Sequence, residues 1–366
     1  MKIECVKENI GGVISKVERI SGKNLNLQIL NNICIEVKDK VVKIKSTNLD
    51  LGVEIIVPAK IYSEGVVVVP GKILSVFLEN LKNDSIVFFE KKESILFIST
   101  KHNSSNIKTY PDNEFPTIPT IKNTEITKIS LKDFISGLKS VWFSASVLNI
   151  KPELSSIFIY PSSDFMVFVT TDSFRLAEKK IKIRKGGELD TILIPVKNIP
   201  EIIKVFEDVL GEVDVKIDKN QISFTKNGIY LTSRLIDGVF PDYKQIIPKE
   251  FLTEVIVLKE DIINALKVSQ IFSDNFNQII FTINPKQKKF ELKTKNGDIG
   301  ESLQLVDGVM KGEESTLSFN HKYITDCFQS IIGDSVSLRL SGVGKPMVIQ
   351  SVSDNTFTYI VMPMNK

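Results

Sequence analysis

The chain has 366 residues, 42% of them hydrophobic, and a net charge of only +3, values typical of an ordinary globular protein of two or three domains. No run approaches the ~18 apolar residues of a membrane-spanning helix, and the N-terminus lacks the apolar core of a signal peptide. We therefore expect a cytoplasmic protein. Cys5, Cys34 and Cys327 follow no spacing pattern, which argues against a disulfide framework or a zinc site and predicts buried thiols.

One unit occurs three times along the chain. Each copy opens with a short β-like run, then a lysine near an acidic residue, then a helical pattern, at Met1–Val17, Ile129–Val141 and Val255–Val268. A second helical pattern follows in each copy, at Val69–Leu81, Ile194–Leu210 and Phe319–Ile332. The lysines Lys72, Lys197 and Lys322 in this second pattern are separated by 125 residues in both steps. Equal spacing of a repeated unit predicts three similar domains.

Strands outnumber helices in every copy. Alternating, β-branched runs such as Asp84–Ile98 and Val213–Phe224 predict strands, and Asn227-Gly228 predicts a hairpin turn. We predict an α+β fold in which each domain is an antiparallel sheet with two helices on one side. Short segments rich in proline or threonine place the domains at residues 1–120, 129–248 and 253–366.

The predicted helices are amphipathic. The helix at Leu131–Trp142 should expose Lys132, Ser136 and Lys139 on its polar face. The helix within Ile194–Leu210 should bury residues at helical spacing, namely Ile199, Ile202, Ile203, Phe206, Val209 and Leu210, and expose Lys197, Glu201, Lys204 and Asp208. A solvated face explains one such helix. Similar lysines on six helices favour weak contact with a nucleic-acid backbone, whatever its base sequence.

Residues that could carry catalysis are sparse. His102 and His321 are the only histidines, and neither has a metal-ligand partner at a useful spacing. The segment Ser341–Pro346, SGVGKP, lacks the spacing of a phosphate loop and predicts a hairpin turn. No nucleophile elbow or dense carboxylate cluster is present. We therefore predict no enzymatic activity, no cofactor and no metal.

Three motifs resemble one family. Thr170–Ala177 reads TTDSFRLA, Leu235–Tyr243 reads LIDGVFPDY, and Tyr359–Met364 reads YIVMPM. Together with the threefold repeat, they make the whole chain similar to the bacterial sliding clamp, the β subunit of DNA polymerase III holoenzyme. The resemblance implies a head-to-tail homodimer that closes into a ring of six clamp domains, with twelve helices lining a hole for duplex DNA. It implies a processivity factor that tethers the replicative polymerase, the clamp loader and other replication and repair proteins.

The resemblance also implies a hydrophobic peptide-binding cleft between the second and third domains. Leu176, Ile246, Ile360 and Met362 would bury the apolar anchors of a partner, and Arg175 would bind its polar groups. The full set implied for the cleft is Leu154, Thr171, Ser173, Phe174, Arg175, Leu176, Pro241, Ile246, Asn320, Tyr323, Pro346, Ile360, Met362, Pro363 and Met364. Ser173-Phe174 replaces the Gly-His of the family, which adds an aromatic ring at the rim.

Contacts with DNA and with a second protomer complete the expectations. The residues expected to face DNA are Lys23, Lys72, Lys132, Lys139, Lys197 and Lys204, and those at the dimer interface are Ile107, Ile271 and Phe272. The aromatic residue that the family carries near position 105 is absent, and Asn24 aligns with an arginine of the family. Two alternatives stay open: an adaptor that binds peptides but does not close a ring, and an enzyme built on a triplicated fold.

Overall fold

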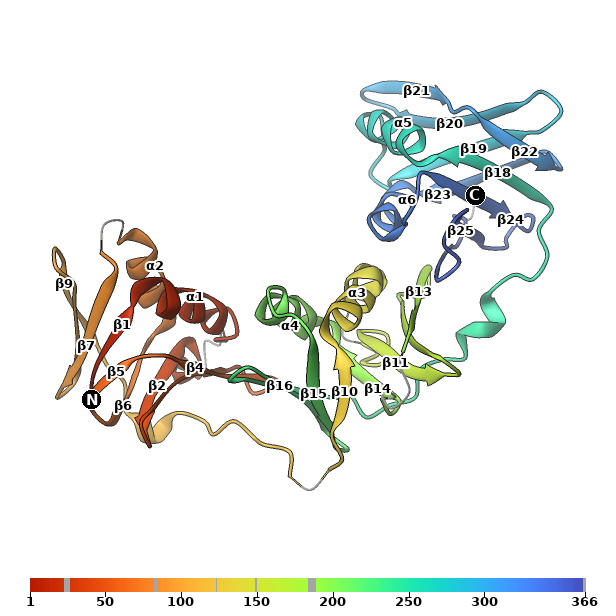
Figure 1. The fold of residues 1–366 in the computed structure, drawn as a ribbon. Helices are drawn as coiled ribbons and strands as arrows, with labels where there is room; N and C mark the ends of the chain where they lie inside the picture. Colours follow the sequence, from red (N-terminus) through yellow and green to blue (C-terminus); the bar gives the residue numbers. More distant parts are fainter. Residues whose placement is uncertain (23–26, 82–83, 123, 149, 184–188, 365–366) are drawn as a thin grey trace. The chain divides into compact units, whose positions relative to one another are not determined.

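The computed structural model describes residues 1–22, 27–81, 84–122, 124–148, 150–183 and 189–364 (Figure 1). The chain divides into two compact units, each built from two segments. The first unit comprises Met1–Lys132 and Lys197–Leu235, and the second comprises Asp133–Val196 and Ile236–Lys366. Within the described ranges, every helix is too short or too polar to cross a membrane.

The first unit holds two antiparallel sheets, with strand orders β5-β1-β7-β8-β9 and β10-β15-β16-β17-β4-β3-β2-β6. Its strands are β1 Lys2–Val6, β2 Asn32–Lys38, β3 Val41–Thr47, β4 Leu51–Val57, β5 Lys60–Ser63, β6 Gly65–Pro70, β7 Ile86–Lys92, β8 Ile95–Ser99, β9 Ser104–Lys108, β10 Thr127–Ser130, β15 Glu212–Ile217, β16 Gln221–Lys226 and β17 Ile229–Arg234. Its helices are α1 Lys7–Glu18, α2 Gly71–Asn80 and α4 Ile199–Phe206. Helix α1 packs beside α2 (Figure 1).

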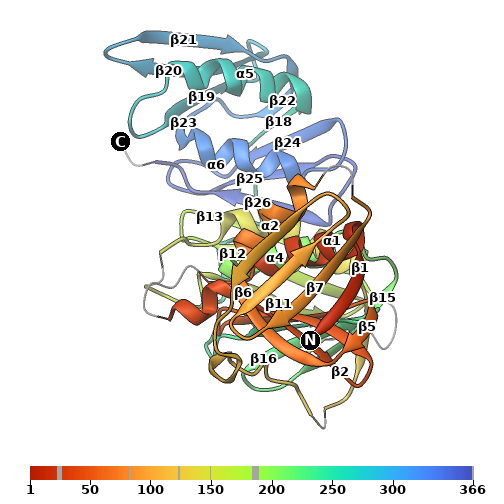
Figure 2. The same ribbon diagram turned by 90° about the vertical axis from the view of Figure 1, so that its left-hand side faces the viewer.

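The second unit also holds two antiparallel sheets, with strand orders β14-β11-β12-β13-β26-β25-β24-β18-β22 and β21-β20-β19-β23. Its strands are β11 Ser156–Ser162, β12 Phe165–Thr171, β13 Arg175–Lys182, β14 Ile192–Pro195, β18 Thr253–Leu258, β19 Gln278–Asn284, β20 Lys289–Asn296, β21 Gly300–Leu305, β22 Gly308–Gly312, β23 Ser315–Asn320, β24 Ser335–Leu340, β25 Met347–Ser351 and β26 Phe357–Val361. Its helices are α5 Lys259–Ile271, α6 His321–Asp326 and, from Asp133 onward, α3 Leu131–Val141. Figure 2 shows α5 beside the strands β19 to β21.

The three repeats share one strand pattern. In each, a first half-sheet of four strands runs β6-β2-β3-β4, β14-β11-β12-β13 or β23-β19-β20-β21. A second half-sheet runs β1-β7-β8-β9, β10-β15-β16-β17 or β18-β24-β25-β26. The pairs β17–β4 and β13–β26 join the second half-sheet of one repeat to the first half-sheet of the repeat before it. The strands β9 and β21, whose counterparts are paired across repeats, lie at sheet edges.

The segment between the first two repeats packs against the β17–β4 joint. Ile118 is buried, and a Cβ atom added at Gly52 would lie 2.9 Å from its side chain, so only glycine allows this approach. The hydroxyl of Tyr230 donates a hydrogen bond to the carbonyl of Pro119 at 2.8 Å. The linker therefore stabilises the joint from its solvent side.

Two of the lysines that mark the start of each repeat have a structural role. Lys7 Nζ donates to the carbonyl of Leu81 at 2.5 Å, and Lys259 Nζ donates to the carbonyl of Ile331 at 2.6 Å. Each acceptor follows the second helical segment of the same repeat, where unpaired carbonyls carry partial negative charge. Each lysine therefore ties the first helix of its repeat to the end of the second.

The amphipathic faces are largely as expected, with differences at helix ends. Helix α4 begins with Pro200 in its first turn and ends at Phe206, so Leu210 leaves the helical spacing and is 82% exposed. The expectation that Leu210 is buried is therefore wrong, Ile203 and Val209 are half-buried, and Val205, which was not in the expected set, is buried. Trp142 falls in the 3-10 turn Trp142–Ser144 after α3 and is 37% exposed.

The remaining local expectations can be compared with the structure directly. Asn227 and Gly228, with φ of 48° and 77°, form the two-residue turn between β16 and β17, as predicted. Ser341–Pro346 connects β24 to β25, which confirms a hairpin connection. The three cysteines are free and buried, and burial raises the pKa of the Cys5 and Cys34 thiols to about 12.

We predict opposite effects of alanine at two helical glycines. A Cβ atom at Gly137 in α3 would lie 2.4 Å from the ring of Phe168, so Gly137→Ala should lower the free energy of unfolding by about 1–2 kcal/mol. Gly12 in α1 has no atom within 4 Å of such a Cβ, so Gly12→Ala should raise it by about 0.5–1 kcal/mol. Urea denaturation measures both, and stabilisation by both variants would contradict the close packing at Gly137.

Candidate functional site

The turn between β12 and β13 carries the TTDSFRLA motif and is held by its own side chains. Thr171 Oγ1 accepts from the N–H of Ser173 at 3.1 Å and donates to the carbonyl of Arg175 at 2.7 Å. Asp172 Oδ1 accepts from the N–H groups of Phe174 and Arg175, both at 3.0 Å. Ser173 has a φ of 77°, in the left-handed region that a short polar residue tolerates. The motif thus specifies a rigid turn that presents Phe174 outward.

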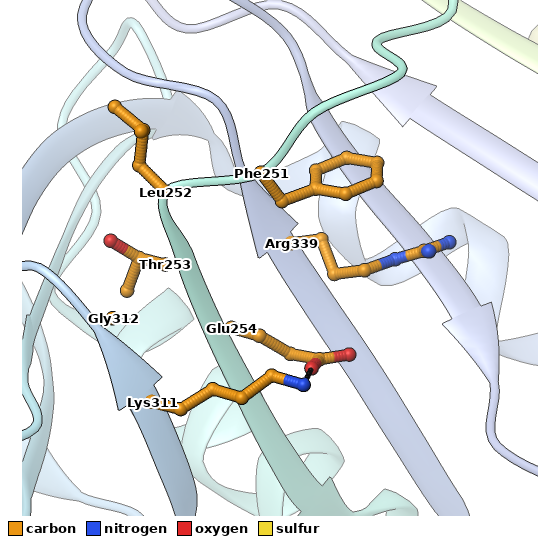
Figure 3. A pocket seen from close by; sticks show the side chains of 7 residues that line it. All are labelled: Phe251, Leu252, Thr253, Glu254, Lys311, Gly312 and Arg339. Carbon is orange, nitrogen blue, oxygen red and sulfur yellow. Dashed lines mark ion pairs between the residues drawn. The ribbon is translucent and has the colours of Figure 1, made fainter.

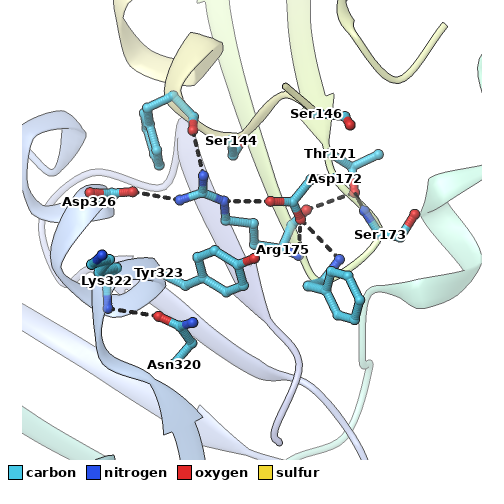
Figure 4. A network of polar contacts seen from close by, with 12 residues as sticks. Ser144, Ser146, Thr171, Asp172, Ser173, Arg175, Asn320, Lys322, Tyr323 and Asp326 are labelled. Carbon is cyan, nitrogen blue, oxygen red and sulfur yellow. Dashed lines mark hydrogen bonds and ion pairs between the residues drawn. The ribbon is translucent and has the colours of Figure 1, made fainter. Parts of the chain in front are cut away.

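Arg175 links this turn to the third repeat (Figure 4). Its Nε donates to Asp172 Oδ2 at 2.9 Å, and its Nη1 donates to Asp326 Oδ2 at 2.6 Å. Its Nη2 donates to the carbonyl of Phe143 at 2.8 Å, and its guanidinium lies 4.4 Å from the centre of the Tyr323 ring. Burial alone would lower the pKa of Arg175, but the electrostatic interaction with Tyr359, the hydrogen bond to Asp326 and the charge of Asp172 together outweigh burial and raise it.

The C-terminal segment is held beside the same turn by backbone hydrogen bonds. Strand β26 pairs with β13, and beyond its end the N–H of Met362 donates to the carbonyl of Phe174 at 2.8 Å. The N–H of Met364 donates to the carbonyl of Ser318 in β23, also at 2.8 Å. Met362, Pro363 and Met364 are half-buried. The residues after the last strand are therefore held as an extended segment between the turn and β23.

An apolar core lies beneath this surface. Leu154, Leu176 and Ile360 belong to one buried cluster, and Leu176 stands opposite Ile360 in the β13–β26 ladder. The other buried members are Val167, Val169, Leu193, Phe240, Tyr243 and Val348. The ring of Phe240 stacks on Phe158, with centroids 4.8 Å apart. This core fixes the positions of the turn and of β26.

The residues expected in a cleft differ in how far they are buried. Leu154, Thr171, Leu176, Pro346 and Ile360 are buried. Those that are half-buried are Arg175, Asn320, Tyr323, Met362, Pro363 and Met364, and those that are exposed are Ser173, Phe174, Pro241 and Ile246. Phe174 and Ile246, at 60% and 48%, are large exposed apolar side chains. A hydrophobic partner would therefore meet Phe174, Ile246 and the terminal methionines first.

Two expected roles change with these positions. Leu176 and Ile360 are 2% and 1% exposed because they pack into the chain's own core, so they support the surface from beneath. Arg175 has its side chain only 11% exposed and uses three donor atoms within the chain, so it positions the turn. The role of Asp172 as the partner of Arg175 could have been predicted from the motif, because the two residues are three apart in it. Phe143 and Asp326 carry no local sequence signal, since they meet Arg175 only through the fold.

The lysines expected to face DNA differ in their surroundings. Lys72, Lys132 and Lys139 are exposed. Lys197 forms an ion pair with Asp50 at 2.6 Å, and Lys204 pairs with Glu207. Lys23, like Asn24, lies outside the described residues. Of this set, the exposed lysines of α2 and α3 are therefore better placed to contact phosphates than the paired lysines near α4.

The residues expected at a dimer interface also differ in burial. Ile107 lies in the edge strand β9 and is 7% exposed, so its side chain packs inside its own sheet. Ile271 ends α5 and is 63% exposed, and Phe272 is half-buried. Among the residues that the structure describes, no group of three or more His, Cys, Asp or Glu is placed to hold a metal ion.

Comparisons with known proteins match the chain over almost its full length. Models of the N-terminal, central and C-terminal domains of the DNA polymerase III beta subunit match residues 1–119, 128–242 and 244–365. A beta sliding clamp from Synechococcus elongatus is 24% identical over 371 residues, covering 100% of this chain and 99% of that protein.

Solved structures agree with these matches. The DNA polymerase III beta subunit of Thermotoga maritima has a TM-score of 0.92 and 26% identity, covering 100% of this chain and 99% of that one. The DNA polymerase sliding clamp of Bacillus subtilis has a TM-score of 0.93 and 22% identity over the same shares. The chain thus has the fold of these clamps, with three clamp domains built on antiparallel sheets.

We expect Arg175→Ala to lower the free energy of unfolding by about 3 kcal/mol, because it leaves the carboxylates of Asp172 and Asp326 without their cation. Arg19→Ala is a matched control, since Arg19 pairs with Glu201 at a surface position with its side chain 45% exposed. The control should cost less than about 1 kcal/mol. Chemical denaturation of both variants makes the comparison, and equal losses would show that Arg175 does not link the turn to α6.

Proposed function

Because the chain belongs to the DNA polymerase III beta subunit family, the bacterial sliding clamps, we propose that it is a ring-shaped processivity factor that encircles duplex DNA and tethers the replicative polymerase. The observation that carries this proposal is the match of all three family domains to consecutive stretches of the chain. The protein is a non-catalytic clamp and needs no cofactor. It acts in the cytoplasm, where the clamp loader places it on DNA.

The repeated strand pattern supports ring closure. Two of the three possible joints are made within the chain, by β17–β4 and by β13–β26. The third joint of the same kind would pair β9, from the first repeat, with β21, from the third repeat. We propose that two copies make this joint head to tail, so that their six domains close into one ring. The domain limits proposed are 1–120, 129–248 and 253–366.

The backbone of β9 is suited to such pairing. The N–H of Thr109 donates to the carbonyl of Ser94, so in this ladder residues 105, 107 and 109 direct their backbone groups toward β8. The backbone groups of Ser104, Asn106 and Lys108 therefore face the open edge of the sheet. An unpaired edge of this kind favours pairing with another strand. The exposed Ile271 would lie at the same interface.

A closed ring explains why the chain needs little net charge. A clamp that surrounds DNA is lost only when the ring opens, so each lysine need contribute only a weak, salt-dependent attraction to phosphate. Lys72, Lys132 and Lys139 supply this attraction in the proposal, with Lys23 as a further candidate. The ion pairs of Lys197 and Lys204 limit their share. Weak contacts of this kind allow sliding.

The partner-binding surface proposed is the one around the β12–β13 turn. Phe174, Ile246, Met362 and Met364 form its contact surface, and the buried Leu154, Leu176 and Ile360 support it. Methionine side chains adapt to differently shaped partners, which suits a surface shared by a polymerase, a clamp loader and repair proteins. An extended peptide with apolar anchors is the ligand proposed.

The ring proposal predicts the effect of a proline at the β9 edge. Asn106→Pro removes an outward N–H and places a ring where a partner strand would pair, while edge positions tolerate proline within their own sheet. We expect the dimer dissociation constant, measured by sedimentation, to rise by roughly 10-fold or more. Retention on nicked circular DNA should fall accordingly, and the thermal midpoint of the monomer should stay unchanged.

Linearised DNA serves as the control for encirclement. Wild-type protein should stay on nicked circles and leave when the DNA is linearised. A monomeric wild-type protein that binds polymerase peptide but is never retained on circles would instead favour the adaptor without ring closure. Unaltered dimerisation of the Asn106→Pro variant would contradict the assignment of β9 to the joint.

The partner surface predicts which truncations weaken peptide binding. Phe174→Ala and Met364→Ala should each weaken binding of a labelled polymerase clamp-binding peptide by roughly 10-fold, measured by fluorescence anisotropy, because each removes exposed apolar contact area. Val309→Ala is the matched control, since Val309 is 74% exposed on β22 of the same unit. Equal affinity of all three variants would exclude this surface. Removing residues 359–366 is a poorer test because Tyr359 to Val361 are buried strand residues.

A further inference from the structure

His321, the first residue of α6, is buried without a hydrogen-bond partner for its ring. The residue is 2% exposed, and neither Nδ1 nor Nε2 has a partner among the described residues. Its backbone, in contrast, is fixed on both sides. The N–H of His321 donates to the carbonyl of Asn277 at 2.7 Å, and its carbonyl accepts from the hydroxyl of Thr325 at 3.0 Å. Most buried polar side chains are hydrogen-bonded, so a ring held in this way needs an explanation.

Two ion pairs of the second unit show what a charge needs in order to leave water. Lys179 Nζ, whose side chain is 5% exposed, lies 3.2 Å from Asp354 Oδ2. Glu254 Oε2 lies 2.6 Å from Lys311 Nζ in an open pocket beside β18 (Figure 3). In each pair the buried group faces an opposite charge, which offsets the cost of burial. The ring of His321 has no such counter-charge bound to it, so the fold favours its neutral form.

The charges around α6 do not compensate for this burial. Strand β23 and the 3-10 turn Cys327–Ser330 pack against α6 and carry no charged residue. The charges that act on the ring come from Lys322 and from Asp326, whose carboxylate is bound by Arg175. Burial and Lys322 lower the pKa of His321, and Asp326 opposes them only in part. Other charged residues on the neighbouring segments are Lys259, Glu260, Asp261 and Lys267 of α5, Asp274 before β19, and Asp172 of the β12–β13 turn.

Protonation of the buried ring would place a charge and a second unpaired donor in the interior. An exposed histidine has a pKa of about 6.5, and the pKa of His321 in the closed structure is lower. As the pH falls, open forms of α6 therefore take up the proton before the closed form does. The closed form keeps its full stability above about pH 6.5 and loses stability as the pH falls below that value. One proton changes the opening equilibrium constant by at most about 10-fold per pH unit.

His321 lies between two segments that fix the partner surface. Three residues before it, the carbonyl of Ser318 accepts from the N–H of Met364 at 2.8 Å. Two residues after it, the ring of Tyr323 lies 4.4 Å from the guanidinium of Arg175 (Figure 4). An opening at the start of α6 would therefore loosen both the terminal segment and the β12–β13 turn.

We propose that His321 makes the partner surface sensitive to acid. Below about pH 6.5, uptake of a proton by the buried ring favours opening of α6 at its first turn. The turn that carries Arg175 and the segment that carries Met364 then lose part of their support. The opening of α6 is a property of the second unit by itself, and its effect on peptide binding rests on the proposed function.

Hydrogen exchange of the full-length protein, followed by mass spectrometry over residues 318–330, measures the opening of α6. After correction for the intrinsic exchange rate, the opening constant of the wild type should rise roughly 3-fold to 10-fold from about pH 7.5 to about pH 5.5. His321→Leu keeps an apolar side chain of similar size but takes up no proton, so its opening constant should not rise. His102→Asn is the matched control, since His102 is the other histidine and its side chain is 55% exposed in the first unit. The control should behave like wild type.

Histidine-ring NMR covers the case in which His321→Leu does not fold. The chain has only two histidines, so the wild type gives two ring signals, and His102→Asn assigns them. The signal of His321 should keep the chemical shift of a neutral imidazole at about pH 6, below the midpoint of an exposed histidine. A His321 signal that titrates at about pH 6.5 or above would overturn the proposal. An opening constant that rises equally in wild type and His321→Leu would do the same.

Peptide binding tests the link between α6 and the partner surface. From about pH 7.5 to about pH 5.5, the dissociation constant of a labelled polymerase clamp-binding peptide should rise more for wild type than for His321→Leu, by roughly 2-fold or more. Acid-sensitive opening of α6 without this difference would overturn the link. A peptide that binds at neither pH would contradict the proposed function, while the exchange measurement still decides the role of His321.

Discussion

The pairing of backbone groups across repeat boundaries is the constraint on which the rest of the structure depends. A four-stranded half-sheet ends in a strand whose N–H and C=O groups need partners. The chain supplies them twice, through β17–β4 and β13–β26. As a result, the middle repeat belongs half to one compact unit and half to the other. The repeats are therefore not independent modules, and β9 and β21, the counterparts of the strands paired in this way, lie at sheet edges.

The outward face of the nine-stranded sheet shows how a joint is reinforced by polar side chains. Side-chain hydrogen bonds lie along this face: Ser337 donates to Glu254, Arg339 to Gln350, and Gln350 to Thr358. From the 3-10 turn Tyr243–Ile246, Tyr243 donates to Glu178 and shares a hydrogen bond with the hydroxyl of Tyr160. Burial and the bond to Glu178 raise the pKa of Tyr243. Because Tyr243 lies in the segment between the second and third repeats, these bonds tie the linker to the β13–β26 joint.

Features that depend on neighbouring residues in the chain could be predicted from the sequence. The helices with Ile202 or Leu138 on their apolar faces and the Asn227-Gly228 turn express local backbone preferences, and the threefold spacing shows when segments of the sequence are compared with one another. The TTDSFRLA motif located a turn held by its own side chains. Errors occurred where a local pattern ran past its element, as at Leu210, and where a charged residue found a distant partner, as Lys197 did with Asp50.

The sequence by itself determined the family, the three repeats and the alternation of strands and helices, because short motifs and local periodicity identify each element and recur from one repeat to the next. The tertiary structure decided which residues stay available to a partner. Arg175 is occupied because Asp326, 151 residues away, reaches it, and Leu176 and Ile360 are covered because their strands pair. Among the described residues, Arg339 Nε has no hydrogen-bond partner for the same kind of reason. Burial and pairing are sums over distant neighbours, which no local pattern encodes.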